Sequence, residues 1–324
     1  MKRFLGVTIS TVFALVLISS TPTIGVYAEE SNISDEVTEG VYTYNVEDQS
    51  ESYSAVTYDV CNNAPDDNIY GDIPETAPII VSDEQPADSD LVSDSTYDPQ
   101  VIVGKDDRSP IDRPDLSGRY RNTCSLEIKR PDGVTYIGTG FILSNNAVIT
   151  AGHCVYDDGE WATSIKVYPA KYGSTNPYGY ATGTSFSCGS AWKNSGNTSQ
   201  DWGLIRINSS SNLCGKCGSL GLRWQSGTYV DDYVSIAGYP VTYKSKTPNG
   251  KYMYKHSGKI SSNTSSVLTY KDIDTSGGES GAPVVEYYQD SGWTAIGIHR
   301  GTINGKNSAV RISEWLFNYF IDNQ

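Results

Sequence analysis

The chain has 324 residues, with 38 acidic against 24 basic side chains and a formal net charge of −14 at pH 7. Residues 29–100 hold 19 of the acidic residues and no Lys or Arg, whereas residues 101–324 carry a net charge of +3. The overall charge therefore describes neither part. The basic residues form no stripe interleaved with aromatic side chains, which argues against nucleic-acid binding.

The first 28 residues have the features of a secretory signal peptide. Lys2 and Arg3 precede a mostly apolar run over residues 4–18, and Val26-Tyr27-Ala28 offers a small-residue cleavage site. A membrane anchor is the alternative, but the apolar run is shorter than the ~20 residues that a spanning helix needs. We therefore expect a secreted, extracellular protein with no membrane association once the signal is removed.

Residues 29–100 form an acidic segment that is rich in Ser, Thr, Asn, Pro and Tyr and has no sustained periodicity. High net charge with little apolar content favours disorder. Its position, ahead of an enzyme-sized region, predicts a propeptide whose carboxylates cover the active-site mouth and keep the enzyme latent. The alternative is a solvated spacer that stays attached. The region 101–324 suits one enzyme domain of two subdomains.

From residue 119 onward the chain consists of short β-forming segments separated by turns. Such spacing predicts an all-β barrel or sandwich. The segments are 123–128, 134–143, 147–150, 204–207, 229–237, 284–287 and 294–298. Pro-Asp-Gly at 131–133 and Asn-Gly at 249–250 and 304–305 predict hairpin turns.

A helix is predicted at the C-terminus, over about 312–322. Its apolar residues recur with helical spacing, and Ser313 is a candidate N-cap. We expect its aromatic stripe to pack on the β-structure rather than to bind a ligand. The stripe consists of Ile312, Trp315, Leu316, Tyr319 and Phe320.

Six cysteines are present, and export makes disulfides reasonable. Cys124 and Cys154 bracket the stretch that leads to His153, and we expect them to pair. Cys214 and Cys217 form a lone Cys-x-x-Cys with no second ligand pair nearby, so no zinc site is expected there. No other ligand cluster in the sequence lets a metal site be placed. A redox motif would need a different fold context. Removal of the propeptide leaves five cysteines, so at least one has no intrachain partner.

Three residues carry the predicted chemistry. His153 ends the segment Thr-Ala-Gly-His, Asp201 precedes the strand 204–207, and Ser280 lies in Gly-Glu-Ser-Gly. Their order in the chain is that of a chymotrypsin-like serine protease. Ser280 would be the nucleophile, His153 the base that takes its proton, and Asp201 the carboxylate that holds the imidazole. Asp157 and Asp158 lie nearer to His153 in sequence, but their surroundings resemble an exposed turn.

The glycines around Ser280 predict a tight turn that the substrate can approach closely. The N–H groups of Gly278 and Ser280 would then stabilise the oxyanion. An α/β-hydrolase is a competing interpretation, but that fold places its acid and its histidine after the serine. Only His299 follows Ser280, and the region lacks alternating strands and helices.

These motifs, with Gly238-Tyr239-Pro240, the run 274–283 and the run 101–108, resemble the bacterial glutamyl endopeptidases. The resemblance covers about residues 101–320. It implies two chymotrypsin-like antiparallel β-barrels, the first at about 101–212 and the second at about 213–311, followed by the C-terminal helix. It also implies cleavage of protein or peptide substrates after Glu and, less well, Asp, without a cofactor.

The resemblance further implies that Thr275 and His299 bind the substrate carboxylate. A protonated His299 and the freed amino group of Val101 would add positive charge to this pocket. Asp274 keeps an alternative open, because trypsin-like enzymes carry a Lys- or Arg-selecting aspartate six residues before the serine. Arg300 is a second departure from the pattern, facing either an acidic substrate or solvent. A catalytically silent protease-fold binding module is a further alternative.

Overall fold

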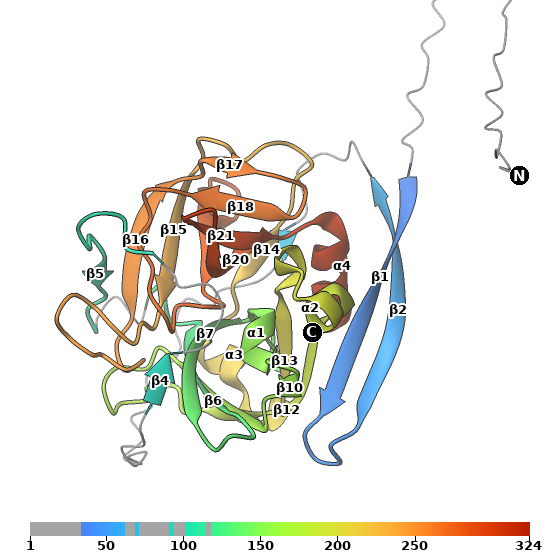
Figure 1. The fold of residues 1–324 in the computed structure, drawn as a ribbon, viewed down its shortest axis with the longest axis horizontal. Helices are drawn as coiled ribbons and strands as arrows, with labels where there is room; N and C mark the ends of the chain where they lie inside the picture. The colour runs from blue at the N-terminus through green and yellow to red at the C-terminus, as the bar shows by residue number, and fades with distance from the viewer. Residues whose placement is uncertain (1–33, 62–68, 71–90, 94–100, 114–117) are drawn as a thin grey trace, which may run out of the picture. The chain divides into compact units, whose positions relative to one another are not determined.

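The computed structural model describes residues 34–61, 69–70, 91–93, 101–113 and 118–324 (Figure 1). The predicted signal peptide lies outside the described residues. No helix among those described is both long and apolar enough to cross a membrane.

The first half of the protease region is a closed barrel of six antiparallel strands. Each strand pairs with the next and the last pairs with the first, in the order β6 (Thr123–Lys129), β7 (Thr135–Ile142), β8 (Ala147–Thr150), β13 (Gly203–Ile207), β12 (Ala181–Gly189) and β11 (Ser164–Pro169). The predicted turn at 131–133 joins β6 and β7, with Gly133 at a φ of +82°. All four residues of β8 are buried, as expected for a short, uninterrupted apolar strand.

The second half is a separate, mainly antiparallel sheet with its own apolar core. Its strand order is β17 (Ser262–Asn263), β18 (Val267–Tyr270), β21 (Lys306–Arg311), β20 (Gly292–Ile303), β19 (Pro283–Tyr288), β15 (Tyr233–Gly238), β16 (Tyr254–Lys259) and β5 (Ser109–Pro110). Two short strands extend it, since β14 (Gly221–Arg223) pairs in parallel with β20, and β3 (Ile69–Tyr70) pairs with β14. We call this layer the second sheet.

The remaining predicted turns differ in their roles. Asn304 and Gly305 have φ of 51° and 72° and join β20 to β21, as a primed hairpin turn requires. Asn249 and Gly250 also have positive φ, but they lie within the longer connection from β15 to β16. The hairpin turn predicted at 304–305 is thus confirmed. The one predicted at 249–250 is wrong, because these residues lie within a longer connection and do not join two paired strands directly.

Helices are few and short. The C-terminal helix is α4 (Glu314–Asp322), and Ser313 caps it by accepting from the Leu316 N–H at 3.2 Å. Its aromatic stripe packs on Trp202, 5.1 Å from the Tyr319 ring, so both predictions for this segment are confirmed. The other short elements are α1 (Gly152–Val155), α2 (Ser190–Ser195), α3 (Leu213–Cys217), 3₁₀ turns at Thr198–Gln200 and Ser209–Ser211, and the ribbon of β9 (Tyr156–Asp157) and β10 (Glu160–Trp161).

The all-β, two-part architecture agrees with the sequence-based expectation, with one difference at the start of the protease region. The sequence predicts that residues 101–110 belong to the first barrel. They lie instead against the second sheet, where β5 pairs with β16 and Val103 N–H donates to Asp274 at 2.7 Å.

The expectation that the whole acidic segment is disordered is wrong for residues 34–61. They form a β-hairpin of β1 (Ser34–Asn45) and β2 (Glu51–Cys61), and β1 pairs with β12 at the side of the barrel (Figure 1). The hairpin holds seven acidic residues and no Lys or Arg, and this high net charge favoured a prediction of disorder. The average composition of the segment did not show its Val, Thr and Tyr residues, which favour β-strands. A shorter strand, β4 (Leu91–Ser93), pairs in parallel with β7.

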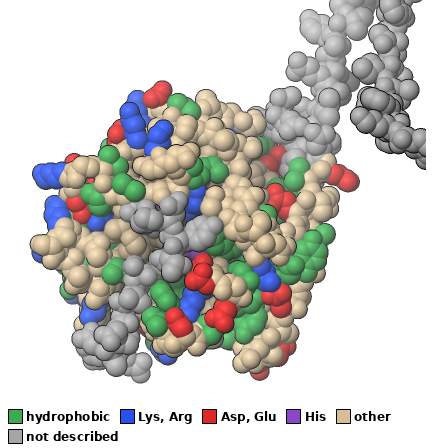
Figure 2. All heavy atoms as spheres, viewed as in Figure 1, with side chains coloured by type: hydrophobic (Ala, Val, Ile, Leu, Met, Phe, Trp, Pro, Cys, Tyr) green, Lys and Arg blue, Asp and Glu red, His purple; other side chains and the backbone are tan. Residues whose placement is uncertain are grey.

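Charge is unevenly distributed over the described surface. On the face viewed in Figure 2, Lys and Arg side chains are most frequent over the second sheet, away from the hairpin. The acidic hairpin therefore does not dock by meeting the most basic part of this face.

Candidate active site

His153 and Asp201 are brought together by two neighbouring strands of the barrel. His153 follows β8 and Asp201 precedes β13, and Thr150 of β8 pairs with Gly203 of β13. The Asp201 carboxylate bridges the histidine, because Oδ2 accepts from ring Nδ1 and Oδ1 accepts from the backbone N–H, both at 2.8 Å. Both residues are buried, with 2% and 1% of their surface exposed. The carboxylate thus holds the ring through one bond and the backbone of the same residue through the other.

The close approach of this carboxylate requires the glycine before the histidine. A Cβ at Gly152 would lie 3.0 Å from Asp201 Oδ1 and equally close to the Trp192 ring. From the other side, the Arg130 guanidinium donates to the His153 carbonyl. Asp157 is more buried than its sequence suggested, at 9% exposed, but the carboxylate that contacts the ring belongs to Asp201.

Ser280 lies where the second sheet meets the barrel. Its carbonyl accepts from Thr139 N–H of β7 at 2.7 Å and lies 3.7 Å from Sγ of Cys154, the residue after His153. Its hydroxyl lies 3.3 Å from the Arg300 carbonyl. These contacts place the serine beside the short helix that carries the histidine, so the two residues occupy one site.

The two glycines around this serine are required by their backbone conformation and by their neighbours. Gly278 has a φ of +95°, and a Cβ there would lie 2.5 Å from the Tyr239 carbonyl oxygen. Gly281 has a φ of +85°, and its Cβ would lie 2.0 Å from the Thr139 carbonyl oxygen. Any other residue would clash with backbone at both positions, so the serine loop keeps its shape only with glycine.

A buried ion pair that was not predicted lies beneath the serine loop. Arg108 and Glu279 are each 2% exposed, and the guanidinium Nη1 lies 2.5 Å from Glu279 Oε2. The same carboxylate oxygen accepts from Ser276 N–H at 2.7 Å, and Arg108 also donates to the Ser276 hydroxyl at 2.6 Å. Asp106 completes the network by pairing with Arg108 Nη2 at 2.9 Å.

This network ties the segment after Val101 to the backbone of the loop that holds Gly278 and Ser280. Burial raises the pKa of Glu279 to about 7, and the adjacent Arg108 guanidinium opposes that rise. Removing one partner of a buried pair leaves the other charge uncompensated, which destabilises the local structure strongly. The pair therefore holds the serine loop in a fixed conformation.

The predicted substrate-binding residues Thr275 and His299 are both fully buried, at 0% exposed. Among the described residues, Thr275 Oγ1 and His299 Nε2 have no hydrogen-bond partner. A buried polar atom left unpaired costs about 1–3 kcal/mol, so such atoms in a native protein call for an explanation. A polar ligand group that enters the site would supply the missing partner.

The other ring nitrogen of His299 is held by a tyrosine. His299 Nδ1 hydrogen-bonds the Tyr270 hydroxyl, which also lies 3.2 Å from the Ser308 carbonyl. Burial lowers the pKa of His299 to about 3, with Arg300 as a further cause. The ring is therefore neutral near pH 7, which corrects the expectation that a protonated His299 brings charge to the unliganded pocket.

Asp274 is occupied by the N-terminal end of the protease region. Its Oδ1 accepts from Val103 N–H at 2.7 Å and its Oδ2 accepts from Asp107 N–H at 2.9 Å. His256 Nδ1 lies 3.6 Å from the same carboxylate and accepts from Asp274 N–H at 2.8 Å. Both oxygens of the Asp274 carboxylate thus accept hydrogen bonds from backbone N–H groups, which opposes a role in binding a Lys or Arg side chain of a substrate.

Val101 lies next to the residues of the predicted pocket. Its N–H donates to Asn307 Oδ1 at 3.0 Å, and its carbonyl accepts from Asn307 Nδ2 at 2.7 Å and from Thr275 N–H at 3.4 Å. The backbone at Val101 is therefore fixed to Thr275 and to β21.

The predicted disulfide between Cys124 and Cys154 does not form. Opposite Cys154 the chain has a glycine, since a Cβ at Gly138 would lie 3.0 Å from Cys154 Sγ. Cys124 lies near Cys217, and its thiol contacts the Asn122 carbonyl. Bracketing a stretch of sequence did not bring the two cysteines together, because the position that faces Cys154 holds no sulfur. The described cysteines form no disulfide with one another.

Comparison with known proteins is consistent with this geometry. Residues 113–315 match the Trypsin family, which is more than half of the chain. The chain belongs to the trypsin family of serine proteases. As a member of that family it is a serine endopeptidase, and the site around Ser280 lies within the matched residues.

Two curated relatives of this trypsin-family protease come from bacilli. The chain is 37% identical over 226 residues to the extracellular metalloprotease of Bacillus subtilis, with 69% of each chain covered. It is 30% identical over 230 residues to the glutamyl endopeptidase of Bacillus licheniformis, with 68% of each covered. The first name describes that relative; in this chain, no group of three or more His, Cys, Asp or Glu within the described ranges is placed to hold a metal ion.

Solved structures support the same fold for this trypsin-family protease. A Glu endopeptidase structure aligns with a TM-score of 0.59 at 23% identity, covering 69% of this chain and 100% of its own. The protease Anisep from Arthrobacter nicotinovorans aligns with a TM-score of 0.51 at 20% identity, covering 62% and 94%. At these identities the likeness concerns the fold alone.

Proposed function

We propose that this serine endopeptidase hydrolyses peptide bonds through an acyl-enzyme formed on Ser280, with a preference for Glu on the acyl side. The observation that carries the mechanism is the double contact of Asp201 with His153. A carboxylate on Nδ1 keeps the ring proton there, so that Nε2 is the nitrogen that accepts the serine proton.

In the first step Ser280 Oγ attacks the scissile carbonyl carbon while His153 Nε2 takes the hydroxyl proton. The C–N bond then breaks, and His153 returns that proton to the leaving amine, which departs as the new N-terminus. In the second step water repeats the attack on the ester, and its proton passes through His153 to Ser280. Asp201 stabilises the imidazolium formed on the way and keeps its own charge throughout.

The N–H groups of Gly278 and Ser280 are the donors that we assign to the oxyanion. Both belong to the loop that the Arg108–Glu279 pair holds from below. Donors that are fixed before the reaction stabilise developing charge without reorganisation, which is usually the largest electrostatic contribution to catalysis. Arg108 and Glu279 act as positioning residues in this proposal, since they touch the loop and not the substrate.

The preference for Glu rests on the unpaired atoms of Thr275 and His299. A carboxylate accepts two or more hydrogen bonds, and hydrogen bonds to a charged acceptor are about twice as strong as neutral ones. The Thr275 hydroxyl and the His299 Nε2–H can each donate one. The likeness to the Bacillus licheniformis glutamyl endopeptidase supports the same specificity.

Tyr270 would select the ring form of His299 that this contact needs. A carboxylate only accepts hydrogen bonds, so Nε2 must carry the hydrogen and the neutral ring must then accept at Nδ1. The Tyr270 hydroxyl meets Nδ1 and, in the unliganded site, donates to the Ser308 carbonyl at 3.2 Å. Carboxylate binding would therefore require Tyr270 to turn its one hydrogen from Ser308 to Nδ1. Carboxylate binding would also raise the pKa of His299 from its low unliganded value, because a nearby negative charge favours the protonated ring.

The trypsin-like alternative needs Asp274 to face the substrate. Its two bonds to Val103 and Asp107 argue against that role. Cleavage before Val101 would instead leave an α-amino cation beside Thr275, which favours an acidic side chain. Both points support Glu over Arg.

Residues 1–28 and 29–100 are proposed to be a signal peptide and a propeptide that keeps the enzyme latent. The pairing of β4 with Thr135–Ile137 of β7 supports latency, because this edge adjoins the serine loop. A Cβ at Gly278 would lie 3.2 Å from Ile137, and Thr139 of the same strand donates to the Gly278 carbonyl. A propeptide strand at this place would hinder an extended substrate. The extracellular relative from Bacillus subtilis supports export.

Three matched peptide substrates test the specificity. Peptides that differ only in having Glu, Gln or Arg before the scissile bond are compared by kcat/KM with enzyme processed before Val101. We expect Glu to be preferred over Gln by about 10- to 150-fold, the worth of a hydrogen bond to a charged group, and over Arg by more. Equal kcat/KM values for the Glu and Gln peptides would contradict the proposal of a carboxylate-binding pocket. Faster cleavage of the Arg peptide would support the alternative in which Asp274 selects the substrate.

A further inference from the structure

The hairpin of residues 34–61 is bound along one edge of the barrel. Five residues of β1, from Val41 to Asn45, pair in register with Gly189 to Ser185 of β12. Within the barrel, β11 pairs with β12 only at Ala181 and Thr182. β1 pairs with the rest of that edge of β12, which β11 does not reach. Without the hairpin, this stretch would be an unpaired strand edge, which natural proteins usually cover.

Apolar contacts reinforce the strand pairing at one end. Val41 is 1% exposed and belongs to the cluster that contains Trp202 and the aromatic residues of α4. Trp315 Nε1 donates to the Val56 carbonyl at 3.1 Å, and the Tyr58 ring lies 5.9 Å from the Trp315 ring. Tyr58 also donates to Asp322 at 2.8 Å. Removal of the hairpin would expose this aromatic surface.

The turn end of the hairpin makes a second set of contacts. Tyr44 stacks on Trp161 at 5.6 Å, and Glu51 accepts from Trp161 Nε1 at 2.5 Å. Lys193 of α2 lies 3.2 Å from Glu51 and 4.3 Å from the centre of the Tyr42 ring. Both ends of the hairpin are therefore anchored to the protease region.

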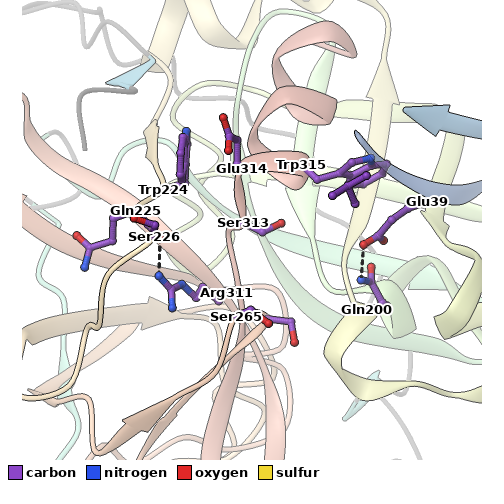
Figure 3. Close-up of a pocket in the computed structure, with 12 residues that line it drawn as sticks. Glu39, Gln200, Trp224, Gln225, Ser226, Ser265, Arg311, Ser313, Glu314 and Trp315 are labelled. Carbon is purple, nitrogen blue, oxygen red and sulfur yellow. Dashed lines mark hydrogen bonds between the residues drawn. The ribbon is translucent and has the colours of Figure 1, made fainter. Parts of the chain in front are cut away.

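One contact leads directly to the catalytic carboxylate. Gln200 donates to Glu39 of the hairpin at 3.2 Å (Figure 3) and accepts from Trp202 Nε1 at 2.8 Å. Asp201 lies between Gln200 and Trp202 in the chain. Gly40 packs against α2, where an added Cβ would lie 2.5 Å from Ser190 Oγ. The hairpin thus supports both flanks of the loop that carries Asp201.

The hairpin also forms one wall of a cleft of about 390 Å³ (Figure 3). Val37 and Glu39 line it from the hairpin, together with Trp315 of α4 beside Glu39, and Trp224 lies across the cleft (Figure 3). Burial raises the pKa of Glu39. The catalytic residues do not line this cleft, so the hairpin docks at a place distinct from the substrate site.

We propose that residues 34–61 are a strand partner of the protease domain that stays bound after the chain is cut in the segment that follows, and that holds the Asp201 loop in place. Latency would then belong to the later part of the propeptide, near β4, and the hairpin would belong to the working enzyme. Its retention does not depend on the proposed substrate preference. Its effect on Asp201 rests on the proposed role of that residue.

Retention is tested on the full chain with Ser280→Ala, so that the enzyme cannot cut itself. A recognition sequence for a specific protease is inserted within residues 62–68, and the cut protein is analysed by gel filtration and intact mass. We expect the hairpin fragment to elute with the rest of the chain. Immediate separation of the fragment from the otherwise unchanged protein would overturn the proposal without bearing on catalysis.

Two substitutions across one ladder pair make this test specific. Val41 pairs with Ser54 in the hairpin, but Val41 is buried whereas Ser54 is exposed. Val41→Asp should release the fragment after cutting, because it buries an unpaired charge. Ser54→Asp introduces the same residue at an exposed position of the outer strand β2 and should leave the fragment bound. Equal retention of both variants would show that the described interface does not hold the hairpin.

The effect on Asp201 has its own readout. The bond from His153 Nδ1–H to Asp201 should give a proton resonance far downfield in the uncut Ser280→Ala protein. Glu39→Ala should broaden or shift this resonance, because it removes the acceptor of Gln200. Glu36→Ala, at an exposed position of the same strand, is the matched control. Identical spectra for the two variants would refute the link to Asp201 and leave retention to stand on its own result.

Discussion

The barrel and the second sheet contribute to the site in different ways. The barrel supplies His153 and Asp201 from the ends of two adjacent strands, so ordinary strand pairing brings them together. The second sheet supplies Ser280 and His299 and holds them with buried polar groups, such as the Arg108–Glu279 pair and Tyr270. The comparison teaches that one half of the site depends on regular packing, and the other on polar contacts whose members must all be present.

The largest effect is expected from removing the Ser280 hydroxyl, on which residues of both the barrel and the second sheet act. Ser280→Ala should lower activity by ~10⁶-fold, because the members of a triad act as a unit. Hydrolysis of the Glu peptide measures the loss, and circular dichroism checks that the protein is folded. Ser276→Ala, in the same loop, is a less severe comparison. Near-normal turnover by the Ser280 variant would contradict the mechanism.

The next prediction tests the polar half. Arg108→Met should lower kcat by on the order of 10²-fold, the loss expected when an oxyanion donor is misplaced, while KM changes less. Arg113→Met is the matched control, since Arg113 is exposed and only five residues away. Glu279→Gln in the Arg108→Met background should add little, because the pair acts as one element. Additive losses from the two substitutions would mean that the residues act separately.

The barrel half can be tested by strengthening it. Gly138→Cys should form a disulfide with Cys154, because a Cβ at position 138 would lie 3.0 Å from Cys154 Sγ. The bridge closes a loop of roughly 16 residues, for which ~3 kcal/mol of stabilisation is expected. Intact mass without reductant detects the bond, and thermal unfolding with and without reductant measures its effect. Reduced thiols in the purified variant would rule out this geometry.

The same difference between the halves explains what the sequence could predict. The strand 147–150 and the Ser313 cap were predicted because they depend on neighbouring residues. The strand β12 was missed because its Thr, Ser and Gly residues give no apolar alternation, although its place in the closed ring orders it. The two strands of the hairpin were missed for a related reason. Their segment is acidic and polar, and pairing with the edge strand β12 of the barrel is what orders it.

Within the site, the residues that we propose as catalytic can be chosen from the sequence by type and order, but the residues that support them cannot. Arg108 and Glu279 are 171 residues apart, so nothing in either local sequence announces the pair. The only signal is a glutamate directly beside the proposed nucleophile, a residue type that is rarely fully buried unless paired. Tyr270 carries no motif either, because its role arises from the pairing of β18 with β21 and of β21 with β20.

A smaller effect is expected from the specificity residue. His299→Leu should lower the Glu-to-Gln ratio of kcat/KM by about 10- to 100-fold, because a hydrogen bond to the charged substrate is lost. His256→Leu changes the other histidine outside the proposed triad and should keep the ratio. An unchanged ratio in the His299 variant would clear that residue of the role, and the same change in both variants would indicate a general disturbance of the second sheet.

The smallest effect concerns stability and pH. His299 has its pKa lowered by burial to about 3, whereas in the unfolded chain it titrates near its ordinary value of about 6.5. Between these values the unfolded state binds more protons, so the free energy of unfolding falls as the pH falls. In the Ser280→Ala background, lowering the pH from 6 to 5 should reduce stability through this residue by about 1 kcal/mol. Urea unfolding of the His299→Gln variant should lack that share of the pH dependence; equal slopes would mean that the buried ring accepts a proton as readily as the unfolded one.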